Sequence, residues 1–213
     1  MLNHQVRCWG VIEPKVLKVL STVPRERFVP QAFRALAFAD ADIPLPCSAR
    51  TDYRWTMMRP IVAGRLLQAL DIAGHETVLE IGTGSGFLTA CLANLARHVT
   101  SIDISEERLK LVSETLESLG IKNCELLNQD VFQRPDGPDF DVIAVTASLP
   151  EYDSRFEDLL KLGGRAFMVI GQPPIMEAVL IRRVGIDEWT HESLFETVLA
   201  PLVRGTQLEA FRF

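Results

Sequence analysis

From Thr77 onward the chain alternates between short apolar runs and segments whose apolar residues recur every three or four positions. Short apolar runs are typical of buried strands, and the wider spacing is typical of helices that bury one face. Strands are expected at residues 78–81, 99–103, 124–127, 140–146 and 165–170, and helices at 87–97, between the cap Ser105 and the stop Gly120, and at 154–160. Such alternation predicts a parallel sheet covered by helices on both faces.

The pattern changes beyond Gly171. Pro173-Pro174 interrupts the chain, and residues 176–184 and 191–199 then form two strand-like runs around a turn at 185–187. With no helix between them, these two strands should pair antiparallel at one edge of the sheet. The expected fold class is therefore α/β, a Rossmann-like sheet of seven strands with a C-terminal antiparallel hairpin.

The first seventy residues differ in kind. Two short helices are expected at 14–23 and 31–39, followed by an extended loop that Pro44 and Pro46 hold as far as Trp55. Pro60 can open a further helix that runs to about Leu70, because its missing N–H is harmless in a first turn. We expect residues 1–70 to cap the carboxyl edge of the sheet as part of the same domain as the core at 71–213.

Composition narrows the classes of partner. The 213 residues carry a formal net charge of -6, whereas proteins that bind nucleic acid draw most of their affinity from clustered Lys and Arg. The sequence has no apolar run long enough to span a membrane, and Met1–Arg7 lacks the pattern of a secretory signal. We therefore expect a cytoplasmic, monomeric protein without nucleic-acid or membrane partners.

The spacing of cysteine and histidine residues argues against a metal site. The four cysteines stand far apart with no Cys-x-x-Cys pair, and none of the four histidines has ligand spacing. Cys91 lies in an apolar helix pattern and Cys124 near a strand, so both are expected to be buried free thiols.

The most informative stretch follows the first strand of the core, where Glu80–Gly86 reads Glu-Ile-Gly-Thr-Gly-Ser-Gly. A glycine turn at the carboxyl edge of a parallel sheet lets the backbone approach a nucleotide-like ligand closely. A dinucleotide fingerprint needs a small residue where Phe87 stands, and no Gly-Lys-Ser/Thr follows, so NAD, FAD and P-loop sites are disfavoured. Asp103 ends the next strand about twenty residues after the first glycine, where a carboxylate can accept both ribose hydroxyls. A glycine turn that only packs a helix on a strand is the alternative.

This pattern resembles the adenosylmethionine site of seven-strand methyltransferases. The resemblance implies that the glycine turn meets the amino-acid and sulfur end of S-adenosyl-L-methionine, that Glu80 orients its ammonium group, and that Asp103 holds the ribose. Asp130 would accept from the adenine amine while Val131 packs on the ring, although a solvated loop acid is the rival interpretation of Asp130. Asp141, at the start of its strand, is expected to be structural. The implied donor-binding residues are Glu80, Ile81, Gly82, Thr83, Gly84, Ser85, Gly86, Asp103, Ile104, Asp130 and Val131.

A closer resemblance covers nearly the whole chain. Five sets of residues occur in the order found in protein-L-isoaspartate (D-aspartate) O-methyltransferases: Arg25–Pro30, Ala37–Asp40 with Ile43–Leu45, the glycine motif, Val145–Ala147, and Leu162–Arg165. The resemblance implies repair of damaged proteins or peptides. The abnormal α-carboxylate of an isoaspartyl residue is methylated, and the ester collapses to a succinimide that can reopen as normal aspartate.

One segment departs from that family. Its members carry Gly-Gln-Thr-Ile-Ser-x-Pro in a loop that meets the acceptor, whereas residues 54–60 here read Arg-Trp-Thr-Met-Met-Arg-Pro. Met58 thus replaces a serine and Trp55 a glutamine, so two polar groups become large apolar ones. The candidate residues on the acceptor side are Thr56, Met58 and Thr146. Arg54 or Arg59 is either a replacement carboxylate fork or an ordinary solvated arginine, and Ser148 either lines the pocket or satisfies its own backbone.

Three functions follow from this sequence. The first is methylation of isoaspartyl carboxylates, which needs no catalytic base because a carboxylate is ionised at neutral pH. The second keeps the fold and the donor but takes another acceptor, and the third binds the donor without turnover. The fourth function considered is that of a nicotinamide-dependent oxidoreductase.

Overall fold

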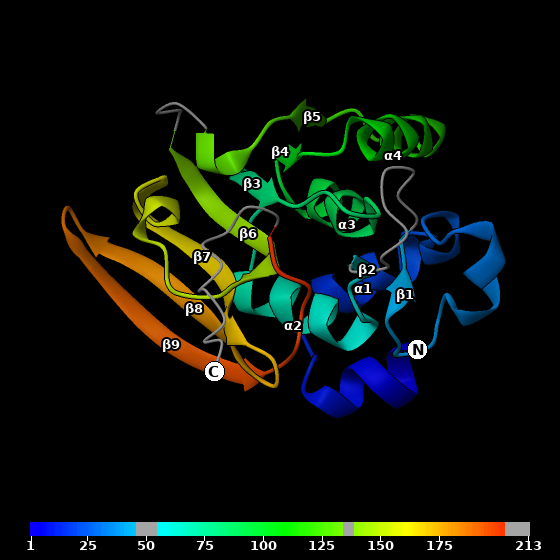
Figure 1. Ribbon diagram of the computed structural model, residues 1–213, viewed down its shortest axis with the longest axis horizontal. Helices are drawn as coiled ribbons and strands as arrows, with labels where there is room; N and C mark the ends of the chain where they lie inside the picture. The colour runs from blue at the N-terminus through cyan, green and yellow to red at the C-terminus, as the bar shows by residue number, and fades with distance from the viewer. Residues whose placement is uncertain (46–54, 134–138, 203–213) are drawn as a thin grey trace, which may run out of the picture.

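The computed structural model describes residues 1–45, 55–133 and 139–202. Its centre is a seven-stranded sheet in the order β5-β4-β3-β6-β7-β8-β9 (Figure 1). The first five strands in this order pair in parallel, whereas β8 pairs antiparallel with β7, and β9 pairs antiparallel with β8. The predicted α/β class, the seven strands and the C-terminal hairpin are confirmed. The strands are β3 (Thr77–Ile81), β4 (His98–Asp103), β5 (Cys124–Asn128), β6 (Phe140–Leu149), β7 (Leu160–Gln172), β8 (Ile175–Gly185) and β9 (Glu188–Glu196).

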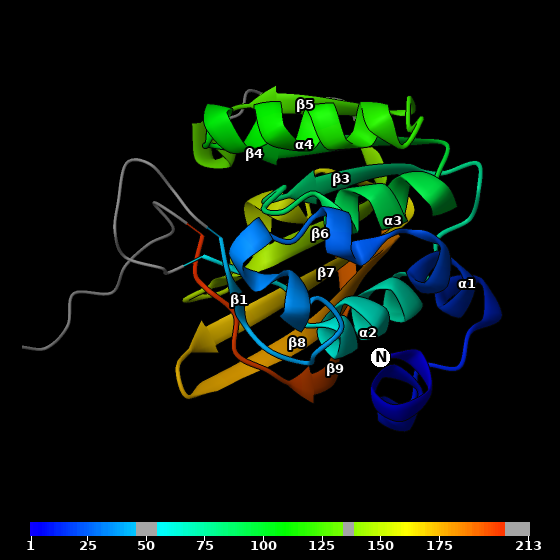
Figure 2. The same cartoon turned by 90° about the vertical axis from the view of Figure 1, so that its right-hand side faces the viewer.

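All four α-helices pack on one face of the sheet, the face toward the viewer in Figure 2. Side chains of the central strands that point to this face, such as Val142 and Phe167, share one apolar cluster with Leu67 and Leu92 of the helices. Four of the predicted helices, those at 14–23, 60–70, 87–97 and between Ser105 and Gly120, are confirmed to within two residues at each end. They are α1 (Pro14–Thr22), α2 (Pro60–Leu70), α3 (Phe87–Leu95) and α4 (Glu106–Ser118).

The opposite face is covered differently from the prediction. Alternate strand residues such as Ile143 and Met168 pack there against Phe156, which lies in a single 3₁₀ turn at Ser154–Phe156. The helix expected at 154–160 is therefore wrong. Asp153 caps the turn through a hydrogen bond from Arg155 N, and β7 already begins at Leu160, so too few residues remain for an α-helix.

The N-terminal region also contains shorter elements than expected. The helix predicted at 31–39 is a 3₁₀ helix at Gln31–Leu36, and the loop before α2 carries a two-residue ladder between β1 (Ile43–Pro44) and β2 (Thr56–Met57). The remaining short turns are Leu2–Val6, Arg7–Trp9, Arg25–Arg27 and Val131–Gln133. Within the described residues no helix is long and apolar enough to cross a bilayer.

A buried cation joins this N-terminal region to the core. Arg25 is 0% exposed, and its Nε and Nη2 donate to the carbonyls of Ala37 and Met58, both at 2.8 Å. Its guanidinium lies 4.7 Å from the ring centroid of Phe87, the first residue of α3. Burial lowers the pKa of Arg25 to about 10, so the group remains charged at neutral pH. One side chain thus connects the 31–37 segment, the loop before α2 and the sheet-packed helix α3.

Asp141 has a structural role at the opposite end of the sheet from the carboxyl edge. Its Oδ2 accepts from Thr77 N, Thr77 Oγ1 and Lys161 Nζ at 2.7–2.9 Å. Burial alone would raise the pKa of Asp141, but these hydrogen bonds lower it to about 2. The carboxylate therefore ties β3 to β6 and β7, as the sequence predicted.

We expect Arg25→Met to lower the free energy of unfolding by about 2–4 kcal/mol, because two buried carbonyls lose their donors. Urea unfolding measures this. Arg27→Met is the control, since the Arg27 side chain is exposed and its one partner among the described residues is Ser118; its effect should stay within about 0.5 kcal/mol. Equal losses in the two variants would contradict the role given to Arg25.

Candidate functional site

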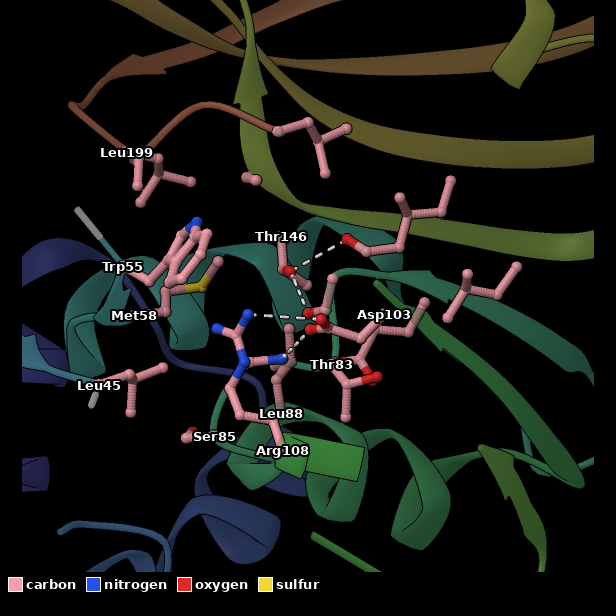
Figure 3. Close-up of a pocket in the computed structure, with 18 of the residues that line it drawn as sticks. Leu45, Trp55, Met58, Thr83, Ser85, Leu88, Asp103, Arg108, Thr146 and Leu199 are labelled. Carbon is pink, nitrogen blue, oxygen red and sulfur yellow. Dashed lines mark hydrogen bonds and ion pairs between the residues drawn. The ribbon is translucent and has the colours of Figure 1, made fainter. Parts of the chain in front are cut away.

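A cavity opens at the carboxyl edge of the sheet (Figure 3). Its floor comes from the ends of β3, β4 and β6, because the carboxyl ends of parallel strands meet at one edge. Its walls come from two distant segments, the β2 region with Leu45, and residues 199–202 beyond β9. The sequence-predicted residues that line it are Thr56, Met58, Glu80, Ile81, Gly82, Thr83, Gly84, Ser85, Asp103, Ile104, Asp130, Val131 and Thr146.

Each of the three positions in the turn requires glycine for a different structural reason. All three have positive φ, but a Cβ on Gly82 would stand 2.6 Å from Thr146 Oγ1, and one on Gly86 would stand 2.4 Å from Val112 of α4. Gly86 therefore packs α4 against the turn and does not line the cavity. A Cβ on Gly84 would meet no atom closer than 3.8 Å, so Gly84 is the glycine whose open side adjoins the cavity.

Glu80 is a buried carboxyl group at the cavity floor. Its Oε2 accepts from Thr89 Oγ1 at 2.5 Å and from Ser101 Oγ at 2.6 Å, whereas Oε1 has no hydrogen-bond partner among the described residues. Burial raises the pKa of Glu80 to about 8, although these two hydrogen bonds act to lower it. A cationic donor reaching Oε1 would supply the missing partner and favour the ionised form.

Asp103 organises the neighbouring turns. Its Oδ2 accepts from the N–H of Gly84 at 3.0 Å, and its Oδ1 accepts from Ser105 N at 2.9 Å. The same carboxylate thus links the glycine turn to the start of α4 and faces the cavity. A carboxylate held this way presents its remaining lone pairs in a fixed direction, as a diol ligand requires.

Asp130 lies beyond the carboxyl end of β5 and also lines the cavity. Its Oδ1 accepts from Phe132 N at 3.0 Å, which caps the turn Val131–Gln133. The residue is therefore positioned by the backbone, with Val131 beside it in the cavity wall.

The side of the cavity nearest β2 is mostly apolar. Trp55, Met58 and Leu199 lie on this side in Figure 3, and the buried Met57 and Leu88 also line the cavity. Such a wall excludes water from an ionic reactant and strengthens the electrostatic interactions inside.

Three other candidate residues have structural partners. The Thr146 hydroxyl donates to the carbonyls at the end of β3, Ile81 O at 3.0 Å or Gly82 O, so it fixes the glycine turn. Ser148 is buried outside the lining, where its Oγ donates to Leu199 O, which is the backbone of the crossing segment and not its own. Arg59 makes a bidentate pair with Asp42 and does not line this cavity.

Two predictions concern residues that the structure does not describe. Arg54, a candidate carboxylate fork, and Cys47 lie outside the described ranges. Among the described cysteines no disulfide forms; Cys91 is buried and burial raises the pKa of its thiol, and Cys124 is half-buried. The described residues contain no cluster of His, Cys, Asp and Glu that would hold a metal ion.

Sequence reasoning missed two parts of the site. Arg108, in the first turn of α4, lines the cavity and lies 3.5 Å from Asp103 Oδ1. Helical spacing from the cap Ser105 could have pointed to it, since position 108 follows the cap by three residues. The segment 199–202 crosses back from β9 and pairs with Ser148. No local pattern marks that crossing.

Comparisons with known proteins agree with this geometry. A family model described as protein-L-isoaspartate (D-aspartate) O-methyltransferase matches residues 1–207. Protein-L-isoaspartate O-methyltransferase 2 of Pelobacter propionicus is 33% identical over 205 residues, which cover 95% of this chain and 88% of that protein. Protein-L-isoaspartate O-methyltransferase of Rhodopseudomonas palustris is 31% identical over 205 residues, which cover 95% of this chain and 91% of that protein.

Solved structures show the same fold. One, described as a protein-L-isoaspartate O-methyltransferase, has a TM-score of 0.79 at 21% identity over 92% of this chain, which spans 63% of that chain's length. A Plasmodium falciparum protein of like description, in complex with S-adenosyl-L-homocysteine, has a TM-score of 0.76 at 19% identity, with 92% and 94% covered. By the family model and the curated relatives, the chain belongs to the protein-L-isoaspartate (D-aspartate) O-methyltransferase family.

Proposed function

We propose that this protein is an S-adenosyl-L-methionine-dependent O-methyltransferase that methylates the α-carboxylate of isoaspartyl residues in damaged proteins or peptides. The observation that carries the proposal is one cavity, in a member of this family, that combines the glycine turn and Asp103 with an apolar wall at the β2 side. The glycine turn and Asp103 suit the donor, and the apolar wall suits a reaction that must exclude water.

The residues of the floor fit the donor. Gly84 leaves room for close backbone approach, and the unpartnered Oε1 of Glu80 suits the donor's ammonium group. The Gly82–Ser85 turn would hold the amino-acid and sulfur end, and Asp103 the ribose hydroxyls. Ile104 and Val131 would flank the adenine, with Asp130 accepting from its amine. Gly86 would contribute indirectly, through the packing of α4.

The bound donor supplies a methyl group already activated on a sulfonium. The protein therefore has to align the acceptor and exclude water, and it needs no base because the acceptor carboxylate is ionised at neutral pH. We assign Thr56 and Met58 to the acceptor side of the cavity. Thr146 would act by holding the glycine turn in place, because its hydroxyl already donates there.

A second candidate function keeps the fold and the donor but takes a different acceptor. The observation that favours it is the apolar character of the acceptor side, where Trp55 and Met58 present few polar atoms. A donor-binding protein without turnover is the third possibility.

One experiment separates these functions. The protein is mixed with methyl-labelled S-adenosyl-L-methionine and an isoaspartyl peptide, and the same peptide with normal aspartate is the control. Base-labile label on the isoaspartyl peptide alone supports the proposal. Donor binding without transfer supports the non-catalytic function, and transfer only to another acceptor supports the second candidate.

We further propose a cytoplasmic protein, monomeric and without a nucleic-acid partner, in which residues 1–70 and 71–213 form one domain. The net charge of -6 supports the absence of nucleic acid. The single domain is supported by one apolar cluster that includes Val16 and Leu20 of α1 together with Val142 and Phe167 of the sheet. The molar mass from sedimentation analysis tests the proposed monomeric state.

Asp103→Ala should weaken binding of S-adenosyl-L-homocysteine about 10- to 150-fold, because charge-assisted hydrogen bonds to the ribose are lost. Isothermal titration calorimetry measures this. Asp141→Asn is the control, since Asp141 lies outside the cavity, and its affinity should match that of the wild type. Unchanged affinity in Asp103→Ala would refute the assignment.

The raised pKa of Glu80 predicts that the stability of the ligand-free protein depends on pH. Between the ordinary carboxyl pKa and about 8 the folded state holds a proton that the unfolded state releases, so stability falls as pH rises. Glu80→Gln lacks this equilibrium. The Tm of Glu80→Gln relative to wild type should therefore increase from pH 5 to pH 8. The exposed Glu125→Gln is the control, and a pH-independent difference for Glu80→Gln would show that Glu80 does not hold the proton.

A further inference from the structure

The charges around the cavity are unequal. Three carboxyl groups line it, those of Glu80, Asp103 and Asp130, whereas Arg108 is the one cationic side chain among the described lining residues. Because burial keeps Glu80 protonated near neutral pH, an anionic acceptor is repelled by Asp103 and Asp130, and a nearby cation offsets that repulsion. Besides the sulfonium of the bound donor, Arg108 is therefore the cation among the described lining residues that a carboxylate can meet.

Arg108 stands between the two halves of the cavity. Its guanidinium carbon lies 4.6 Å from the ring centroid of Trp55, on the acceptor side, and its Nη2 lies 3.5 Å from Asp103 Oδ1, on the donor side. Figure 3 shows the guanidinium beneath Trp55 and Met58 and directed toward Asp103. The side chain is 11% exposed, so little water reaches it.

The donors of this guanidinium are incompletely used. Its Nε is buried and has no hydrogen-bond partner among the described residues, and the contact to Asp103 is at the outer limit for a hydrogen bond. A buried N–H without an acceptor carries a desolvation cost that an incoming oxygen would remove. The planar group stacked on Trp55 is also held in one orientation, which reduces the entropy lost when it binds a carboxylate.

We propose that Arg108 is a specificity-determining residue that binds the acceptor carboxylate through its unused N–H donors. This inference rests on the proposed function, and it names the cation that selects an anionic acceptor in an otherwise apolar wall. Arg59 does not serve this purpose, because Asp42 already takes its donors and it lies outside the lining.

The chemistry of methyl transfer has a second consequence for the role of Arg108. One carboxylate oxygen forms the new bond to the methyl carbon, the carbon–sulfur bond breaks, and its electron pair stays on sulfur. No proton moves, and Arg108 stays protonated while it contacts the other oxygen. The product ester is neutral, so its attraction to Arg108 is weaker than that of the substrate. Arg108 therefore distinguishes substrate from product.

The test compares Arg108→Met, Arg108→Lys and the matched control Lys110→Met, which removes an exposed charge from the same helix. The KM for an isoaspartyl peptide, its Kd on the S-adenosyl-L-homocysteine complex, and the Kd of the methyl-ester peptide are measured. For Arg108→Met we expect the peptide KM and Kd to rise about 10- to 150-fold, as for a lost hydrogen bond between charged groups. The affinity for the ester and for S-adenosyl-L-homocysteine should change less than about threefold.

Arg108→Lys should recover part of the peptide affinity, because it keeps the charge but not the fork. An unchanged peptide KM and Kd in Arg108→Met would overturn the proposal, as would an equal loss of peptide and ester binding. If Arg108→Met lost only S-adenosyl-L-homocysteine binding, the role of Arg108 would be to position Asp103 in the donor site, and this result would also overturn the proposal. If wild type binds the peptide but does not methylate it, the proposed function fails alone; if it does not bind the peptide, both fail.

Discussion

The burial of the Arg25 guanidinium is the constraint on which the rest of the site depends. A charged group in the interior is costly unless it has hydrogen-bond partners, and the Nε and Nη2 groups of Arg25 find acceptors in two separate segments of the N-terminal region. It lies at the same time on Phe87, directly after the glycine turn. The loop that carries Met58 is therefore fixed relative to the strand ends that would bind the donor. Together with the packing of α2 on the sheet, this link sets the position of one half of the cavity relative to the other.

The division of the cavity into two halves follows from this arrangement. Strand ends and turns contribute the carboxyl groups and backbone N–H groups, because unpaired polar atoms occur where a sheet stops. The N-terminal segments and residues 199–202 contribute apolar side chains, because they must also cover the core. Arg108 bridges the halves from the first turn of α4.

Local pattern was sufficient for the parts of the fold in which each residue's role is set by its neighbours in sequence. The strands, the helix capped by Ser105 and the glycine turn belong to this group, and the residues predicted to bind the donor do line one cavity, Gly86 excepted. The failures have tertiary causes. The 3₁₀ turn at Ser154–Phe156 reflects the early start of β7, and the lining role of 199–202 depends on pairing with Ser148, about fifty positions earlier. Spacing from the cap Ser105 could have pointed to Arg108, but its contact with Trp55 is a tertiary one that local pattern does not give.

The crossing of residues 199–202 over Ser148 has a consequence for biosynthesis. Both backbone hydrogen bonds that seat this segment join it to a strand end made much earlier on the ribosome. Among the described lining residues, this wall is therefore the last to be synthesised, and the cavity is complete only once β9 has been made and the chain has crossed back.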